Sequence, residues 1–393
     1  NKYNKKIDVI FIAIFFIMLL IPVSKINLSD KSKEENRFLA KFPTIYTKEW
    51  DFNVNIGQDF DSWLSDRFNM RYELIKLNRI YSCIPNINYC IYNDDIFDKK
   101  NKVIYKGSFW GLTDFKKKEK YDIQKLSLNI KQLNDWCKQN NIKLYILLAL
   151  RRSDFIQYNT FDRRYRSSKD LCDKVVQNLQ YTDVDLIYPY KELKAANRYT
   201  PTYYKTDHHW THTGAYIGYR ALMKEIKKDF PDINIIAESE FDKSESKMVK
   251  TSFKSYLNYG SMLRTSGMPD WYKKRILGTK YLYYTTSKRK DLKILKNSNL
   301  PDFDARFDNI FEYNGGSNKK VLLIGNSYTE SLLEFLPYSF HEVLSLSDNN
   351  RRLYFNKYEK LVKTYKPDII VINIHSNNIV IFYNLYKQIK GDK

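Results

Sequence analysis

Residues 206–214 hold the densest group of proton-transfer side chains in the chain. They read TDHHWTHTG, which places three of the five histidines beside the carboxylate of Asp207. An acid two residues before a histidine can orient that imidazole as a base and stabilise its charged form. In an extended segment, residues i and i+2 point to the same side, so Asp207 and His209 can face one site. Acyl transfer would also require a nucleophile such as serine.

A serine in a suitable local setting occurs far downstream, at Ser327. Residues 320–324, KVLLI, are apolar and partly β-branched, which is typical of a buried parallel strand. Gly325 permits a sharp turn, and residues 329–335 have helical spacing of apolar side chains. This pattern predicts a strand, a turn and a helix. The Ser327 hydroxyl would be exposed at the carboxyl end of the strand, and its backbone N–H could stabilise an oxyanion.

Other interpretations of the same residues remain open. Ser327 could serve only as a helix cap. His208, His209 and His212 could bind a metal, since imidazoles at i and i+4 share one face of a helix. However, the sequence has no His-Glu-x-x-His pattern, and a metal site would leave Ser327 without a role. We therefore expect no metal, and we predict that His208 and His212 are hydrogen-bonded core residues.

The hydrophobic pattern predicts an α/β fold, with a mostly parallel sheet flanked by helices. The strands are expected at 144–150, 321–324, 342–346 and 369–374, and the main helices at 123–139 and 214–228. Ligands of such sheets bind at the carboxyl ends of the strands, which is where Ser327 is expected.

The chain shows no long linker or internal repeat, so we expect one catalytic domain over residues 51–393. Residues 25–50 would form a stalk. Residues 231–317 are rich in Lys, Ser, Asp and Tyr, and we expect them to form a loop-rich insertion on the substrate side of the domain.

An apolar segment near the amino terminus suggests a membrane anchor within residues 1–24. Residues 9–23 carry no charge and follow the basic residues Lys2, Lys5 and Lys6. The segment is short for a full span and suits the apolar core of a signal sequence. Because no small-x-small cleavage site follows Val23, we predict an uncleaved signal anchor. Lysines on both sides leave its orientation open, but a short leading tail normally stays in the cytosol.

Composition narrows the possible partners. The net charge of +21 comes from 66 basic and 45 acidic residues spread along the chain, without a recognisable nucleic-acid-binding motif. We therefore expect no nucleic acid. Attraction to an anionic polysaccharide or membrane is reasonable, although biased codon usage would give the same composition.

The four cysteines are compatible with an exported protein. Cys83 and Cys90 are close enough in sequence to form a disulfide, and the other two cysteines are Cys137 and Cys172. The sequence contains no Cys-x-x-Cys pair, which argues against zinc and thioredoxin-type sites.

Several segments together resemble a known family. Residues 204–216, YKTDHHWTHTGAY, are similar to the signature of the DHHW group of SGNH-hydrolase-like proteins, which are related to the alginate O-acetyltransferases AlgJ and AlgX. Residues 35–43, ENRFLAKFP, and 61–71, DSWLSDRFNMR, resemble further segments of this group. Residues 325–328, GNSY, occupy the place of its Gly-Asp-Ser turn. The resemblance covers most of the chain after residue 34.

This resemblance implies a triad of Ser327, His209 and Asp207. Ser327 would accept the acyl group, His209 would remove its proton, and Asp207 would orient the imidazole. The family further implies an O-acetyltransferase without a cofactor, acting outside the cytoplasmic membrane on an exported or cell-surface polysaccharide. A membrane-bound O-acyltransferase would be the partner that supplies the acetyl group.

Two departures from the family pattern keep alternatives open. Asn326 replaces the usual Asp before the nucleophile, and residues 373–378, NIHSNN, stand where relatives often have Glu-Arg at a strand end. Asn377 is a candidate oxyanion donor there, although these residues could simply end the strand. The same triad could act as a polysaccharide acetylesterase. The chain could also be a non-catalytic polysaccharide-binding or assembly protein.

Overall fold

The computed structural model describes residues 2–20, 24–32, 37–47, 50–71, 73–74, 89–92, 95–98, 103–106, 122–155, 169–204, 209–246, 280–347, 358–383 and 385. The chain divides into two compact units. One comprises residues 1–92 and 255–275, and the other comprises residues 93–254 and 276–393. The stalk and domain boundaries expected from the sequence stay predictions.

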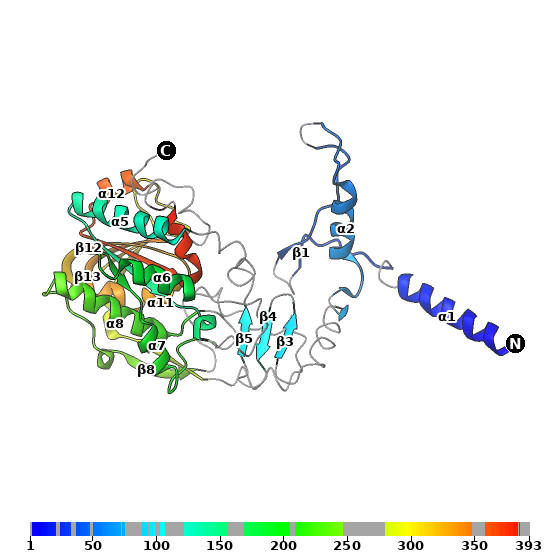
Figure 1. Ribbon diagram of the computed structural model, residues 1–393, viewed down its shortest axis with the longest axis horizontal. Coiled ribbons are helices and arrows are strands. Elements are labelled where there is room, and N and C mark those ends of the chain that lie inside the picture. Colours follow the sequence, from blue (N-terminus) through cyan, green and yellow to red (C-terminus); the bar gives the residue numbers. More distant parts are fainter. Residues whose placement is uncertain are drawn as a thin grey trace. The chain divides into compact units, whose positions relative to one another are not determined.

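A seven-stranded sheet forms the centre of the larger unit (Figure 1). Its strands, in spatial order, are β10 (Lys293–Leu295), β11 (Asn309–Glu312), β13 (Phe340–Ser347), β12 (Ser317–Gly325), β14 (Ile369–His375), β6 (Lys143–Ala149) and β7 (Asp185–Ile187). The pairings from β13 to β7 are parallel, whereas β10 and β11 add two antiparallel pairings at one edge. The sheet is therefore mixed, and its parallel part contains all four strands predicted from the sequence.

Helices cover both faces of this sheet, as apolar runs on the central strands require. Leu322 and Ile324 of β12 face a core shared with α5 (Ile123–Gln139), α6 (Lys169–Leu179) and α12 (Glu359–Tyr365). Val321 and Leu323 face the opposite core, shared with α8 (His212–Asp229) and α11 (Tyr328–Leu332). In Figure 1, α5 and α12 lie above the strands and α8 lies below them. The predicted α/β class is confirmed.

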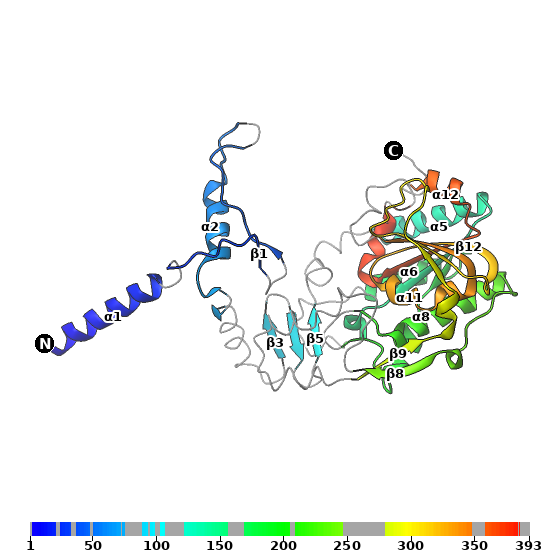
Figure 2. The ribbon, with the colours of Figure 1, turned by 180° about the vertical axis from the view of Figure 1, so that it is seen from behind.

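Shorter elements complete the larger unit. The antiparallel strands β8 (Asp242–Ser246) and β9 (Tyr281–Thr285) lie beside α8 (Figure 2). The remaining elements are α7 (Tyr190–Ala196), the antiparallel pair β4 (Asp95–Asp98) and β5 (Val103–Lys106), and 3-10 helices at Arg152–Phe155, Glu238–Glu240, Ser287–Asp291, Leu336–Ser339 and Ser376–Ile381. The described part of region 231–317 thus contains β8, β9, β10 and β11. Of these, β10 and β11 belong to the seven-stranded sheet.

The smaller unit is organised around a buried arginine, Arg67, at the end of α2 (Ile56–Arg67). Its guanidinium donates hydrogen bonds to the carbonyl oxygens of Ala40, Asn27 and Ser29 at 2.9–3.1 Å. The neighbouring carboxylate of Asp66 accepts a hydrogen bond from the Ala40 amide at 2.8 Å. These contacts join residues of the two segments 35–43 and 61–71 and give the buried guanidinium its hydrogen-bond acceptors. The unit also contains β1 (Lys31–Ser32), β2 (Arg37–Phe38), β3 (Tyr89–Tyr92) and α1 (Lys2–Leu20).

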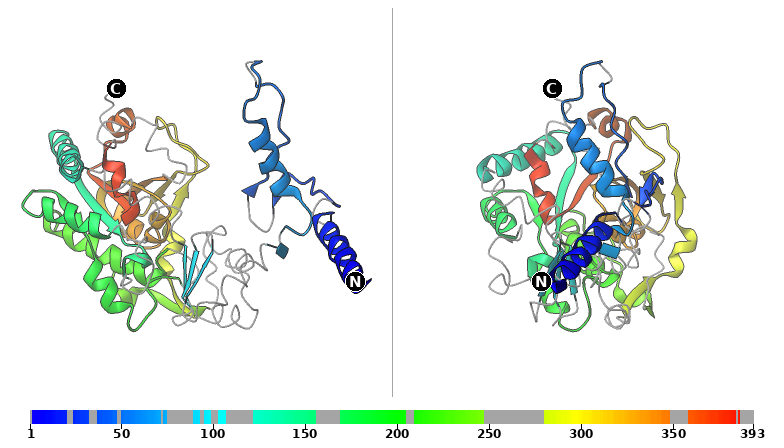
Figure 3. Two further views of the ribbon diagram at one scale, coloured as in Figure 1. Left: turned by 45° about the vertical axis from the view of Figure 1, so that its right-hand side comes forward. Right: turned by 90° about the vertical axis from the view of Figure 1, so that its right-hand side faces the viewer.

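Helix α1, dark blue in Figure 3, covers most of the segment predicted to be an anchor. Within the described part of the chain, no helix has the length and apolar character needed to cross a membrane. The charged residues Lys5, Lys6 and Asp8 all lie inside α1. The predicted membrane-spanning anchor is therefore not supported.

Candidate active site

Strand β12 and helix α11 place Ser327 at the carboxyl edge of the sheet. The strand ends at Gly325, where an added Cβ would overlap Thr329 Oγ1 and the carbonyl oxygen of Asn373 on β14. Only glycine leaves room for these two atoms at the end of the strand. Ser327 occupies the N-cap position of α11, and its side chain is half-buried. The predicted strand, turn and helix are present. Helix α11 ends at Leu332, earlier than predicted, and the chain then continues into a 3-10 helix that contains Pro337.

A local antiparallel bridge positions His209. Tyr203 pairs with Trp210, the Tyr204 amide donates to the His209 carbonyl at 3.2 Å, and the Thr211 amide donates to the Thr202 carbonyl at 2.9 Å. The side chain of Thr211 then caps α8 by accepting a hydrogen bond from the Gly214 amide. His209 is therefore held between a bridge and a capped helix rather than on a free loop.

The structure brings His209 and Ser327 together. His209 Nε2 lies 2.7 Å from Ser327 Oγ, within the range expected for a base and the proton that it removes. His209 is only 5% exposed, so the imidazole is shielded from solvent, whereas Ser327 is partly exposed. Since Nε2 faces the serine, Nδ1 is the nitrogen left for an orienting acid. Asp207 lies outside the described residues, and its contact with His209 stays a prediction.

Trp210 makes a second connection between the same two segments, and we did not predict this role. Its indole Nε1 donates to the carbonyl oxygen of Tyr328 at 3.0 Å, so residues 209–210 are bonded to residues 327–328 twice. Gly214 and Gly218 provide the space, because a Cβ on either residue would overlap Trp210. Two glycines on one helix face, four and eight residues after a tryptophan, were the signal available in the sequence.

Aromatic rings surround this pair of connections. The Tyr328 ring centroid lies 5.0 Å from that of His209, 5.5 Å from that of Trp210 and 5.4 Å from that of His375 at the end of β14. Packing at these separations restricts the rotation of the His209 ring. The His209 imidazole is thus held in place, and a fixed side chain lowers the cost of reaching a reactive geometry.

Buried polar contacts hold the neighbouring strand ends. Asp154 Oδ2 accepts hydrogen bonds from the Arg151 amide at 2.7 Å and from Ser376 Oγ at 2.5 Å, which connects the end of β6 to the end of β14. Asn377 follows in a 3-10 helix, but its side chain is outside the described part of the structure. Donation of a hydrogen bond by Asn377 to an oxyanion stays a prediction.

His212 is a core residue, as predicted, but no hydrogen bond to its ring is present in the described part of the chain. It begins α8, is 1% exposed, and packs against the rings of Tyr283 and Phe335. Neither ring nitrogen has a hydrogen-bond partner among the described residues, so the prediction of a hydrogen bond is wrong. Burial, reinforced by the positive charge of Arg289, lowers the pKa of His212 to about 4. His208 lies outside the described residues.

The lowered pKa of His212 predicts that stability falls with acidification. Below pH 6.5 an unfolded chain protonates this imidazole, whereas the folded protein stays neutral until pH approaches 4, so stability is lost as pH falls. Acidification from pH 7 to pH 5 should therefore lower the free energy of unfolding by about 2 kcal/mol through this group alone. The free energy of unfolding, measured with urea, should differ between the two pH values by less in His212→Phe than in the wild type, and the reduction should equal this amount. The exposed His341→Gln serves as the control, and an unchanged pH response in His212→Phe would refute the assignment.

The described part of the chain contains two cysteines whose side chains can be placed, Cys137 and Cys172. Among the residues that the structure describes, no cluster of three or more metal-binding side chains occurs. Cys137 and Cys172 are buried free thiols, and burial raises the pKa of Cys137 to about 12. This thiol is therefore not a nucleophile near neutral pH. The possible Cys83–Cys90 disulfide involves side chains outside the described part.

Comparisons with known proteins support the fold. Residues 112–352 match the family model described as "SGNH hydrolase-like domain, acetyltransferase AlgX". A DHHW family protein from Eubacterium siraeum has a similar structure with a TM-score of 0.54 and 14% identity, covering 77% of this chain and 97% of that protein. PatB1 of Bacillus cereus gives a TM-score of 0.52 and 17% identity, covering 73% of this chain and 99% of PatB1.

No curated protein sequence matches this chain. The two structural relatives are distant in sequence and support the fold, whereas the family model extends over more than half of the chain and contains both His209 and Ser327. The family resemblance inferred from the motifs is thereby confirmed. The chain belongs to the family of SGNH hydrolase-like domains that includes the acetyltransferase AlgX.

Proposed function

We propose that the protein is an O-acetyltransferase that modifies hydroxyl groups of an exported or cell-surface polysaccharide through an acetyl-Ser327 intermediate. Membership of the acetyltransferase family supports the type of group transferred. The observation that carries the proposal is the distance of 2.7 Å between His209 Nε2 and Ser327 Oγ, which is the contact that serine activation needs.

In the first half-reaction, Ser327 Oγ attacks the carbonyl carbon of an acetyl donor. His209 Nε2 removes the hydroxyl proton as the new C–O bond forms, and then passes that proton to the leaving group as its bond to the acetyl carbon breaks. Asp207 is proposed to stabilise the imidazolium through Nδ1. The backbone N–H of Ser327 and the side chain of Asn377 are the proposed donors to the oxyanion.

In the second half-reaction, a sugar hydroxyl attacks the acetyl carbon of acetyl-Ser327. His209 removes the proton of this hydroxyl, the sugar oxygen forms a bond to the acetyl carbon, and the bond to Ser327 Oγ breaks with return of the proton to the serine. Water could attack in the same manner, which would make the protein an esterase. The protein therefore acts as a transferase when a sugar hydroxyl occupies the acceptor position and as an esterase when water occupies it.

The cellular setting follows from the same proposal. A polysaccharide acceptor outside the cytoplasmic membrane cannot draw directly on cytosolic acetyl donors, so a membrane-bound O-acyltransferase is proposed as the partner that supplies the acetyl group. The amino-terminal segment is proposed to hold the protein at that membrane. The net charge of +21 would favour an anionic polymer or membrane surface nearby.

Trapping the intermediate tests the proposed function. The purified protein is incubated with p-nitrophenyl acetate and quenched, and the peptide that contains Ser327 is analysed by mass spectrometry. We expect an acetyl group on Ser327, and added acceptor oligosaccharide should convert it to acetylated sugar. Free acetate without acetylated sugar would indicate the esterase. Absence of the adduct, together with unchanged polysaccharide acetylation in cells carrying Ser327→Ala, would favour the non-catalytic binding protein.

A further inference from the structure

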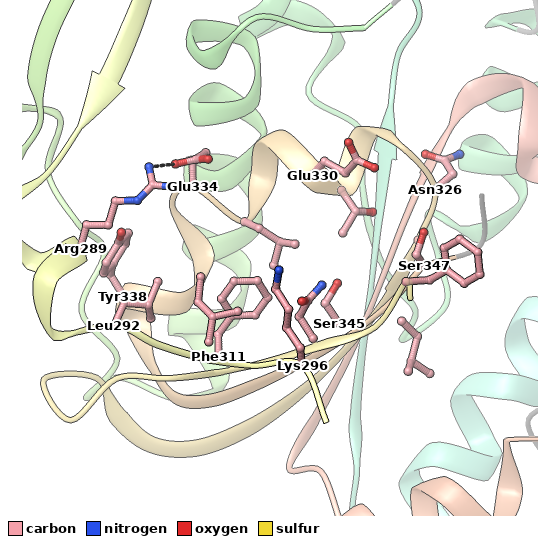
Figure 4. Close-up of a pocket in the computed structure, with 17 residues that line it drawn as sticks. Arg289, Leu292, Lys296, Phe311, Asn326, Glu330, Glu334, Tyr338, Ser345 and Ser347 are labelled. Carbon is pink, nitrogen blue, oxygen red and sulfur yellow. Dashed lines mark hydrogen bonds and ion pairs between the residues drawn. The ribbon is translucent and has the colours of Figure 1, made fainter. Parts of the chain in front are cut away.

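The backbone around Ser327 lies between a cavity and a packed core. Asn326 and Glu330 line a cavity of about 280 Å³ (Figure 4), and neither Ser327 nor His209 is among the described residues of its lining. By contrast, Tyr328 is fully buried in the core shared with α8. Since an empty space supplies no packing contacts, the turn that carries Ser327 is held from the core side.

Trp210 supplies one contact on the core side. Its indole Nε1 donates a hydrogen bond to the carbonyl oxygen of Tyr328 at 3.0 Å, one residue beyond the nucleophile. The indole is fully buried, and a Cβ added to Gly218 would lie 2.7 Å from its ring. Such close packing leaves the ring little room to move. The hydrogen bond therefore ties the backbone after Ser327 to the segment that carries His209.

Tyr203 supplies a second contact from the opposite side of the same bridge. It pairs directly with Trp210, and its hydroxyl donates a hydrogen bond to the carbonyl oxygen of Leu150 at 2.9 Å, just after the end of β6. Tyr203 is 4% exposed, and burial raises the pKa of its hydroxyl well above the ordinary value. The hydroxyl therefore stays protonated through the neutral range and keeps donating this bond.

The two hydrogen bonds attach the bridge to two different strands of the sheet. Tyr328 follows β12 and Leu150 follows β6, and β14 lies between these strands. Neighbouring strands are about 4.8 Å apart, so strands on either side of β14 are separated by about 10 Å. A single attachment would let the bridge pivot, whereas two separated attachments fix its direction as well as its position. His209 precedes Trp210 in this bridge, and its Nε2 lies 2.7 Å from Ser327 Oγ.

We propose that Tyr203 and Trp210 are positioning residues that set the contact between His209 and Ser327 by hydrogen-bonding the bridge to the ends of β6 and β12. This inference rests on the proposed function, since it explains how the base and the nucleophile of that reaction are held together. A misplacement of about 1 Å at a reacting centre can cost on the order of a hundredfold in rate. Loss of either attachment is therefore expected to slow the chemical step.

Tyr203→Phe and Trp210→Phe test the proposal, because each removes one donor and keeps an aromatic ring in the core. The full chain is mixed with p-nitrophenyl acetate over a range of concentrations, and the initial burst of p-nitrophenol is followed. Its rate gives the maximal rate of acylation and the ester concentration needed for half of that rate. Mass spectrometry of the peptide that contains Ser327 confirms that the acetyl group is on this residue.

Two variants provide matched controls elsewhere in the same unit. Tyr216→Phe removes a buried hydroxyl that donates to the Ile236 carbonyl at 3.0 Å, so it deletes the same kind of bond as Tyr203→Phe. Trp136→Phe replaces a buried tryptophan of α5 in the core on the other face of the sheet. Both controls should keep the wild-type rate of acylation, even where urea unfolding shows that they are less stable.

Tyr203→Phe and Trp210→Phe should each lower the maximal rate of acylation by about tenfold or more, with the half-saturating ester concentration unchanged. In the His209→Ala background, the same substitutions should have less than about a twofold effect, because no base is left to position. A merely structural role would lower the rate equally in both backgrounds. Should Trp210→Phe not fold, Tyr203→Phe, which removes a single oxygen atom, carries the test.

An unchanged maximal rate in both variants would overturn the proposal. Equal fold losses with and without His209 would also overturn it, as would a change confined to the half-saturating ester concentration. Failure of the wild type to form acetyl-Ser327 is a different result, because it would overturn the proposed function itself.

Discussion

Ser327→Ala should lower kcat/KM for acetyl transfer by at least about a thousandfold, because it removes the only atom that can carry the acetyl group in the proposed mechanism. His209→Ala should have a similar effect, since an unassisted serine hydroxyl is a weak nucleophile near neutral pH. The two side chains act as one unit through the contact of 2.7 Å. The double variant should therefore be no slower than either single variant.

Initial rates of p-nitrophenyl acetate turnover and of sugar acetylation provide the measurement. His341→Ala is the matched control, because it removes an exposed histidine outside the site. Circular dichroism of each variant should match that of the wild type, since Ser327 is half-buried and its replacement leaves no large cavity. Additive losses in the double variant would show that Ser327 and His209 act in separate steps, and activity retained by Ser327→Ala would exclude the serine mechanism.

Gly325→Ala should destabilise the larger unit by about 2–4 kcal/mol and should also reduce activity. The added methyl group would overlap both Thr329 Oγ1 and the carbonyl oxygen of Asn373. The second obstacle is backbone, so relief requires β12 and β14 to separate at the edge where Ser327 lies. The hydroxyl would then move away from His209, and displacements of this kind are costly for catalysis.

Urea unfolding and acetyl-transfer rates check this prediction together. Gly57→Ala is the control, because a Cβ at that position on α2 meets no atom within 4 Å. A helical glycine replaced by alanine in open space is expected to be neutral or mildly stabilising. If Gly325→Ala proved as stable and active as the wild type, the close approach of β12 to β14 would not be what orients Ser327.

Much of the fold could be predicted because it depends on local patterns. The apolar runs at 321–324 and 369–374 are buried on both faces, which only a covered parallel sheet provides. The helix at 123–139 matches α5 because its apolar spacing is regular and Asp122 caps its start. The antiparallel strands β10 and β11 were not predicted, since each is short and lies in a segment whose composition suggests loops.

The candidate site was predictable only in part. Ser327 was identified from the strand and glycine before it, and His209 from its spacing to Asp207 and from the family motif. The hydrogen bond from Trp210 to Tyr328 was not predicted. A tryptophan followed by a helix with two glycines also occurs in protein cores that have no such bond. The hydrogen bond predicted for His212 was wrong, since a sequence does not show which aromatic side chains enclose a ring.

The sequence alone determined the chemistry that the chain can offer: an Asp-x-His pair, a serine after a glycine turn, and an amide at position 326. These features are local, because backbone conformation and residue type act over a few neighbours. Only the tertiary structure decided that His209 meets Ser327 across 118 residues and that Trp210 donates a hydrogen bond to Tyr328 beside them. Those outcomes depend on how distant strands and helices pack against each other, which fixes separations that no local pattern encodes.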